Sequence, residues 1–121
     1  MKAKILYVDD EPINLQLFKL NFEKKYEVFI ANDGFQGLEI LDNELDILVV
    51  ISDMKMPKMN GVEFIKNAKK QYPDKKFYIL TGYEINTEIQ AALDSGLICS
   101  YFRKPFNIKE IEKTINDAIG L

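Results

Sequence analysis

The 121-residue sequence contains no histidine and only one cysteine. The absence of histidine excludes a histidine general base, a histidine metal ligand and a Ser/His/Asp triad. The single cysteine, Cys99, cannot form an internal disulfide. Because it follows Leu97 and Ile98, we expect it to pack in the core rather than to carry redox chemistry.

The sequence also lacks an excess of basic residues, a signal peptide and a long apolar segment. Its 16 Lys and Arg against 19 Asp and Glu give a net charge of -3, so there is no electrostatic basis for a nucleic-acid surface. No apolar run is long enough to span a membrane. We therefore expect a cytoplasmic protein that inserts into no membrane and forms one domain over residues 1–121.

Apolar runs and helical patterns alternate five times along the chain, with short connections. The predicted strands lie at residues 4–8, 28–31, 47–51, 77–80 and 98–102. The third run is five aliphatic residues without a polar break, which is typical of a strand buried on both faces. This alternation predicts an α/β fold, with a parallel sheet covered by helices on both faces.

Several helix starts are marked by capping residues or by proline. Pro12 suits the first turn of a helix over about residues 13–24, and Asp33 precedes the second helix. Asn60 and Asn107 are each followed three residues later by a glutamate, which is typical of a capping box. The first helix carries more apolar residues than one sheet face needs, so we expect a leftover stripe to form a contact surface.

The apolar residues at helical spacing predict the core-facing sides of these helices, although those of the first helix run around much of its circumference and only most of them belong to the core. They are Leu15, Leu17, Phe18, Leu20 and Phe22 in the first helix, Phe35, Leu38 and Leu41 in the second, Ile85, Ile89 and Leu93 in the fourth, and Ile108, Ile111, Ile115 and Ile119 in the last.

Polar residues collect where the predicted strands end. The first strand leads to Asp9 and Asp10, the third to Asp53, the fourth to Thr81 and the fifth to Lys104. Taken singly, such residues are often only turn or capping residues. Because the carboxyl ends of parallel strands meet at one edge of the sheet, where ligands bind, their joint placement indicates a shared site.

The residue types at this edge favour phosphoryl chemistry. Three converging carboxylates repel one another, and oxygen ligands without histidine or cysteine favour a hard cation such as Mg²⁺, with Mn²⁺ as an alternative. Lys104 and the Thr81 hydroxyl can bind phosphoryl oxygens. Asp53 can then act as the nucleophile and form an acyl phosphate.

These motifs resemble the receiver domain of two-component response regulators over essentially the whole chain. The matching stretches are Val8-Asp9-Asp10, Ser52-Asp53-Met54-Lys55-Met56-Pro57 with Asn60-Gly61, Leu80-Thr81-Gly82 and Lys104-Pro105-Phe106. Within this family the chain is most similar in type to the single-domain chemotaxis regulators. The resemblance implies a flavodoxin-like, doubly wound, five-stranded parallel sheet in the order 2-1-3-4-5 with five helices.

The resemblance also implies a phosphoacceptor rather than an enzyme with a separate substrate. Asp53 would take a phosphoryl group from a histidine of a sensor kinase or a phosphotransfer protein. The domain would catalyse only its own phosphorylation and the slow hydrolysis of the acyl phosphate. Asp10, Asp53 and the Lys55 backbone carbonyl would contact Mg²⁺ directly, and Asp9 would act through water.

Further implications of the resemblance concern switching. Thr81 and Tyr101 match the family's switch pair, which reshapes the face of the fourth helix, fifth strand and fifth helix for a downstream protein. The Lys104-Pro105 peptide bond is typically cis. Lys55 and Tyr83 depart from the commonest pattern at positions associated with phosphoryl lifetime. We expect a monomer or weak dimer, and the pathway, the kinase and any output domain stay open.

Three other readings fit less well. A haloacid-dehalogenase-type enzyme needs a second aspartate two residues after its nucleophile, where this chain has Lys55. A flavin- or nucleotide-binding module needs a glycine- or hydroxyl-rich loop after the first strand, where this chain has Asp9-Asp10-Glu11. A receiver-like interaction module that acts without phosphorylation is the remaining alternative, although such modules usually lack one of the key residues.

Overall fold

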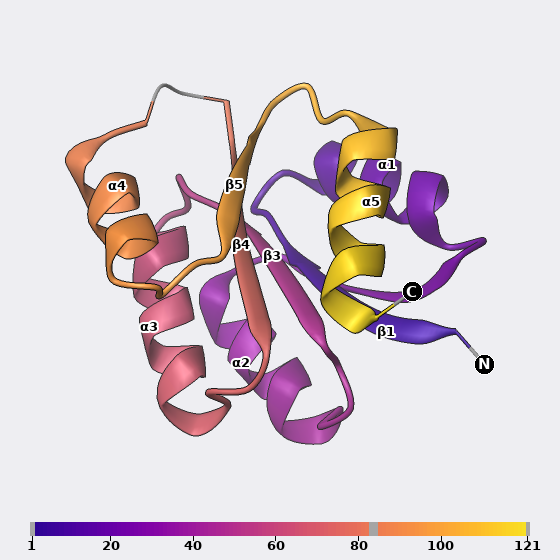
Figure 1. Cartoon of the computed structure of the whole chain (residues 1–121), viewed down its shortest axis with the longest axis horizontal. Helices are drawn as coiled ribbons and strands as arrows, with labels where there is room; N and C mark the ends of the chain where they lie inside the picture. Colours follow the sequence, from indigo (N-terminus) through magenta and orange to yellow (C-terminus); the bar gives the residue numbers. More distant parts are fainter. Residues whose placement is uncertain (1, 83–84, 121) are drawn as a thin grey trace.

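The computed structural model describes residues 2–82 and 85–120, which form a parallel sheet between two layers of helices (Figure 1). The strands are β1 (Ala3–Val8), β2 (Tyr26–Ala31), β3 (Val49–Asp53), β4 (Lys76–Thr81) and β5 (Ser100–Arg103), in the order β2-β1-β3-β4-β5. The helices are α1 (Pro12–Phe22), α2 (Gly34–Asn43), α3 (Gly61–Gln71), α4 (Thr87–Asp94) and α5 (Ile108–Ile119). The predicted flavodoxin-like order is confirmed.

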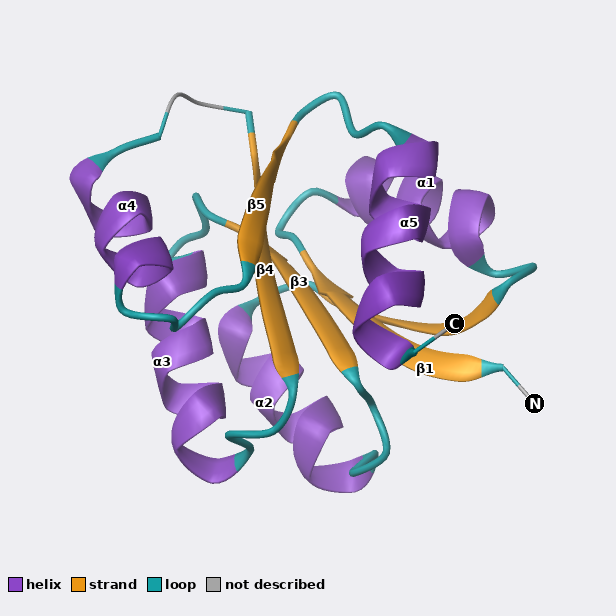
Figure 2. Cartoon of the chain, in the orientation of Figure 1, coloured by secondary structure: helices purple, strands orange, loops and turns teal. Residues whose placement is uncertain are grey.

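Helices α1 and α5 lie on one face of the sheet, and α2, α3 and α4 lie on the other (Figure 2). Each face has its own apolar cluster. Tyr7, Phe18 and Ile111 belong to the cluster under α1 and α5, whereas Phe64 and Ile89 belong to the opposite one. Successive residues of β1 alternate between the two clusters, because neighbouring side chains of a strand point to opposite faces. No helix within the described part of the chain is long and apolar enough to cross a membrane.

Asparagine or aspartate caps four of the helices. The side chains of Asp33, Asn60, Asn86 and Asn107 each accept a hydrogen bond from the backbone N–H three residues later. At Asn60 the reciprocal bond from its backbone N–H to Glu63 completes a capping box. The caps predicted at Asp33, Asn60 and Asn107 are confirmed, and α3 therefore starts at a fixed point beyond β3.

The central strand differs from the prediction at both ends. It spans Val49–Asp53 rather than residues 47–51, and the side chain of Leu48 is exposed. The Leu48 backbone still bonds to Lys4 and Lys76, but its side chain lies at the amino-terminal edge of the sheet, where the cover is incomplete. At the other end the strand includes Asp53, so that the sheet itself holds this carboxylate.

Three predicted core positions besides Leu48 are wrong. Ile108 is exposed, because the buried side of α5 runs through Ile111 and Ile115. Cys99 is exposed, because Ile98 takes the core position and adjacent side chains in an extended segment point to opposite sides. Phe35 is also exposed, since the buried side of α2 runs through Gly34, Gly37 and Leu41. A Cβ at Gly37 would lie 2.9 Å from the Phe64 ring, so the missing side chain lets α2 pack closely against α3.

The first helix has a buried and an exposed apolar side. Leu15, Phe18 and Phe22 are buried, whereas Ile13, Leu17 and Leu20 are exposed. The apolar residues were predicted to run around much of the helix, with most of them in the core. Leu17 and Leu20 lie outside the core because the sheet covers only one side of α1. The prediction that this helix has surplus apolar residues is confirmed, and a contact role for them stays a prediction.

Gly61 provides a test of how closely α3 must approach β3. A Cβ built on Gly61 would lie 2.3 Å from the Asp53 carbonyl oxygen, which is backbone and has little room to move. We predict that Gly61→Ala lowers the free energy of unfolding by about 2 kcal/mol, measured by equilibrium urea denaturation. The control is Gly82→Ala, whose Cβ would meet only Lys104 side-chain carbons at 3.7 and 3.9 Å. Equal effects of the two substitutions would contradict the steric explanation.

Candidate phosphoacceptor site

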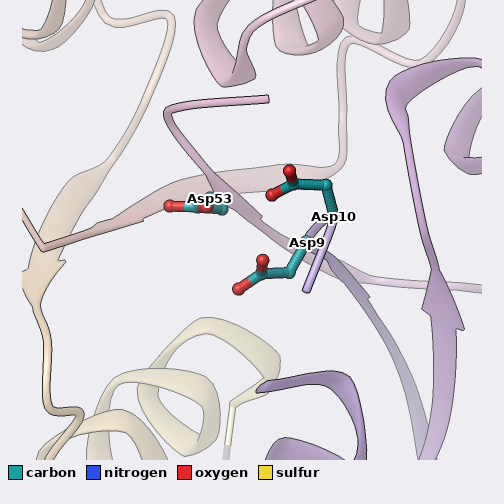
Figure 3. A group of neighbouring side chains, drawn as sticks. All are labelled: Asp9, Asp10 and Asp53. Atoms are coloured by element: carbon teal, nitrogen blue, oxygen red, sulfur yellow. The ribbon is translucent and has the colours of Figure 1, made fainter. Parts of the chain in front are cut away.

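Three carboxylates meet at the carboxyl ends of β1 and β3 (Figure 3). The last paired residues of these strands are Val8 and Ser52, so Asp9 and Asp53 follow side by side on the same face of the sheet. Asp10 completes the group, and each of the three offers an oxygen within 4.8 Å of the others. Asp9 is fully buried and Asp53 is 7% exposed, so solvent screens the repulsion between their charges only weakly.

The Asp9 carboxylate is held by three donors from different elements. The Glu11 backbone N–H donates to Oδ1 at 3.0 Å. The Tyr7 hydroxyl donates to Oδ2 at 2.5 Å, and the Lys104 ammonium donates to the same oxygen at 3.1 Å. Such bonds replace the hydration that a carboxylate loses on burial.

Lys104 bridges the two buried carboxylates. Its ammonium lies 3.1 Å from Asp9 Oδ2 and 3.3 Å from Asp53 Oδ1. Asp53 Oδ1 also accepts a hydrogen bond from the Met54 N–H at 2.9 Å. The Lys104 backbone is anchored by a bond from its N–H to the Thr81 carbonyl at 2.8 Å, so the loop after β5 is fixed against the end of β4.

Burial and charge shift the pKa values of the groups in this site. Burial, followed by the charge of Asp9, raises the pKa of Asp53 to about 6, although Lys104 opposes the shift. Burial acts to lower the pKa of Lys104, but the charges of Asp53 and Asp9 outweigh it and raise that pKa. Burial and the Asp9 charge also raise the pKa of Tyr7, so that its hydroxyl remains a donor.

The acidic cluster opens into a cavity of about 680 Å³. Asp10, Asp53, Lys55 and Lys104 line it, together with Gly82. Carboxylate oxygens without histidine or cysteine form a ligand set that suits a hard divalent cation, and positive charge there would relieve the carboxylate repulsion. The donor set and its spacing therefore fit the predicted Mg²⁺, and the cavity gives a second molecule access to Asp53.

The order of strands and the strand-end residues are those of one protein family, and a family model supports the assignment. The model of the response regulator receiver domain matches residues 5–116. The chain belongs to this family. The resemblance to receiver domains inferred from the sequence motifs is confirmed.

Two relatives and two solved structures illustrate the match. Sporulation initiation phosphotransferase F of Bacillus subtilis is 34% identical over 100% of this chain and 97% of its own. A receiver domain from Clostridium thermocellum is 36% identical, with a TM-score of 0.87 over 98% of this chain and 94% of its own. The response regulator TrrA of Thermotoga maritima, solved with Mg²⁺-BeF, is 31% identical, with a TM-score of 0.83 over 98% of this chain and 99% of its own. By contrast, this chain spans 25% of the hydrogenase regulator HoxA of Bradyrhizobium diazoefficiens, with 26% identity over 100% of this chain.

The structure brings most of the sequence-predicted site residues of the receiver domain to one edge of the sheet. Asp9, Asp10, Asp53 and Lys104 form the cluster, and the side chain of Thr81 is buried at the end of β4. The Lys104-Pro105 peptide bond is cis, as the resemblance implied.

The remaining predicted residues lie farther out. Tyr101 is half-buried on β5, where it pairs in register with Ile79 and packs against the cluster on the α3 and α4 side. The side chain of Lys55 is exposed at the cavity. Tyr83 lies outside the described residues. Their predicted roles in switching and lifetime stay predictions.

Two contacts at the site were not anticipated from the sequence. Tyr7 was counted only as an apolar strand residue, although its position two before Asp9 places both side chains on one face of β1. Asn60 donates to both carboxylate oxygens of Glu88 at 3.2 and 3.3 Å, which links the start of α3 to α4. No sequence pattern signals the second contact, because the two residues are 28 positions apart.

The raised pKa of Asp53 predicts a pH-dependent loss of stability. Between the unfolded pKa of 3.8 and the folded value of about 6, the folded receiver domain binds more protons than the unfolded chain, so stability falls as pH rises through this range. Without divalent cations we expect Asp53→Asn to be more stable than the natural protein at neutral pH, by about 1–2 kcal/mol. The difference should vanish at a pH of about 3.5, below both pKa values.

Urea denaturation at several pH values in the presence of EDTA measures this difference. Asp74→Asn is the matched control, because Asp74 is an exposed carboxylate outside the cluster and its removal should change little. If the natural protein is as stable as Asp53→Asn at neutral pH, the charge of Asp53 does not destabilise the folded protein and the prediction is wrong.

Proposed function

We propose that this chain is the phosphoacceptor of a two-component signalling system, with Asp53 as the accepting residue. The single observation that carries the proposal is the position of Asp53, which lines an open cavity with the Lys104 ammonium 3.3 Å from its carboxylate. The phosphoryl group comes from a phosphorylated histidine of a sensor kinase or a phosphotransfer protein. The chain itself has no histidine that could serve as the donor.

In the proposed reaction an Asp53 carboxylate oxygen attacks the phosphorus atom of the phosphohistidine. A P–O bond forms, the P–N bond breaks, and the imidazole nitrogen keeps the electron pair and then takes a proton. The product is an acyl phosphate on Asp53 and a neutral histidine on the donor protein. Water can later attack the same phosphorus atom, which releases inorganic phosphate and restores the carboxylate.

Lys104 and Thr81 are the proposed partners of the transferred group. The ammonium already pairs with Asp53, and as negative charge appears on the phosphoryl oxygens it can pair with them instead. The Thr81 hydroxyl lies at the end of the neighbouring strand and can donate to another phosphoryl oxygen. Thr81 ends β4 and Lys104 follows β5, at the same edge of the sheet as Asp53, so short movements of their side chains would bring them to the phosphoryl oxygens.

Asp10, Asp53 and the Lys55 backbone carbonyl are the proposed direct ligands of Mg²⁺, with Asp9 acting through water and Mn²⁺ as an alternative ion. When bound, the cation would reduce the repulsion between the carboxylates and the incoming phosphoryl oxygens. The solved relative TrrA contains Mg²⁺-BeF, and its likeness over 98% of this chain supports the same ion here. Asp9 is held by Tyr7, Lys104 and the Glu11 N–H, which suits an indirect role.

We further propose that phosphorylation changes the surface formed by α4, β5 and α5. Movement of Thr81 toward a phosphoryl oxygen would leave space for the Tyr101 ring, which is half-buried on β5 in the described structure. A downstream protein would bind the altered surface. A cytoplasmic location and a monomer or weak dimer belong to the same proposal, whereas the sequence offers no basis for direct nucleic-acid binding.

Phosphorylation of Asp53 can be tested with a small phosphodonor such as acetyl phosphate and Mg²⁺, followed by intact mass measurement. We expect the natural protein and Asp74→Asn to gain one phosphoryl group, because Asp74 is an exposed carboxylate away from the cavity. Asp53→Asn should gain none, and EDTA should abolish the reaction. Equal labelling of Asp53→Asn would show that another residue is the acceptor. Failure of the natural protein to be labelled, even by phosphorylated histidine kinases, would favour a module that acts without phosphorylation.

The lifetime of the acyl phosphate gives a separate prediction for Lys55 and Tyr83. A Lys55 ammonium can pair with a phosphoryl oxygen, and a Tyr83 ring can cover the path of water. Each substitution to alanine should therefore speed hydrolysis about fivefold, which corresponds to about 1 kcal/mol. The decay of phosphorylated protein at fixed Mg²⁺ measures this effect in Lys55→Ala, Tyr83→Ala and the double variant. Unchanged or slower decay in all three would exclude shielding.

A further inference from the structure

Tyr7 is a buried donor inside the acidic site that no site prediction included. Its side chain is fully buried in β1, and its hydroxyl donates to Asp9 Oδ2 at 2.5 Å. A phenylalanine would fill the same strand position without a polar atom. A hydroxyl aimed at a fully buried carboxylate therefore points to a role beyond packing.

The acceptor of this bond is the oxygen that Lys104 also occupies. Lys104 lies 3.1 Å from Asp9 Oδ2 and is thus one of its two side-chain donors. When Lys104 turns to a phosphoryl group on Asp53, it withdraws from this oxygen. A buried carboxylate oxygen that loses its donors incurs a large desolvation penalty, and Asp9 has no exposed surface at which bulk solvent could replace those donors.

We propose that Tyr7 is a positioning residue that keeps Asp9 Oδ2 hydrogen-bonded and so allows Lys104 to move from Asp9 to the phosphoryl group. This inference rests on the proposed function, because it needs a phosphoryl group on Asp53. Tyr7 does not touch the reacting atoms. It acts through Asp9, whose carboxylate it holds in one orientation while the Lys104 contact is broken.

The Tyr7 hydroxyl is rigidly placed because its ring is stacked. The rings of Tyr7 and Phe18 are 4.2 Å apart with an interplanar angle of 16°. The ring of Phe18 in turn packs edge-on against that of Phe106, with 5.8 Å between the ring centroids. Phe106 follows Lys104 by two residues. One aromatic cluster therefore positions both side-chain donors to Asp9 Oδ2.

The test uses Tyr7→Phe, which keeps the stacked ring and removes only the hydroxyl. The readout is the affinity for beryllofluoride, a mimic of the phosphoryl group, measured by NMR titration at saturating Mg²⁺. We expect Tyr7→Phe to bind beryllofluoride about tenfold more weakly, since Lys104 becomes the last side-chain donor to Asp9 Oδ2. The matched control is Tyr26→Phe, which removes another buried tyrosine hydroxyl, bonded to Asn116 at 2.6 Å, outside the site.

A double-mutant cycle separates positioning from a general loss of structure. In an Asp9→Asn background no carboxylate has to be kept paired, so adding Tyr7→Phe should change the beryllofluoride affinity less than twofold. An equal loss in both backgrounds, or no loss in the natural background, would overturn the inference. If Asp9→Asn binds too weakly to measure, the position of Lys104 in a beryllofluoride-bound structure of Tyr7→Phe decides, because full transfer to fluorine would also overturn it. Failure of the natural protein to bind beryllofluoride at all would instead count against the proposed function.

Discussion

Mutual repulsion among Asp9, Asp10 and Asp53 is the constraint on which the functional edge of this receiver domain depends. Two of these carboxylates are buried, so solvent screens them poorly and the protein must supply their partners. Lys104 bridges Asp9 and Asp53. The backbone N–H of Glu11 donates a further hydrogen bond to Asp9, and that of Met54 donates one to Asp53. Burial, followed by the repulsion from Asp9, raises the pKa of Asp53 to about 6. The same repulsion favours binding of a cation at this site.

The fold maintains this unfavourable cluster through backbone geometry rather than through flexible side chains. Parallel pairing of β1 with β3 sets Asp9 beside Asp53, and the capping box at Asn60 fixes where α3 begins. Gly61 allows that helix start to lie against the Asp53 carbonyl. Apolar packing on both faces of the sheet stabilises the arrangement, so the strand ends can carry residues chosen for chemistry instead of stability.

Much of this architecture was predictable because it depends on the spacing of apolar residues and on the turn and capping residues at the ends of helices and strands. The alternation of strands and helices predicted the parallel sheet, and the polar residues at four strand ends predicted the location of the site. Contacts that depend on exact side-chain direction were not predictable. Leu48 and Cys99 were assigned to the core because apolar runs do not reveal where a strand begins, and Tyr7 was treated as apolar because periodicity ignores its hydroxyl. The contact of Asn60 with Glu88 requires the tertiary structure itself.

The most direct test of Asp53 as the acceptor beside Lys104 is a crystal structure of this chain with Mg²⁺ and beryllofluoride. We expect beryllium to be bonded to an Asp53 carboxylate oxygen, with the Lys104 ammonium moved from Asp9 to a fluorine atom. Mg²⁺ should contact Asp10 and Asp53, and the Tyr7 hydroxyl should still donate to Asp9. Beryllofluoride bound at another residue, or a Lys104 ammonium that stays on Asp9 without contacting fluorine, would contradict the assignment.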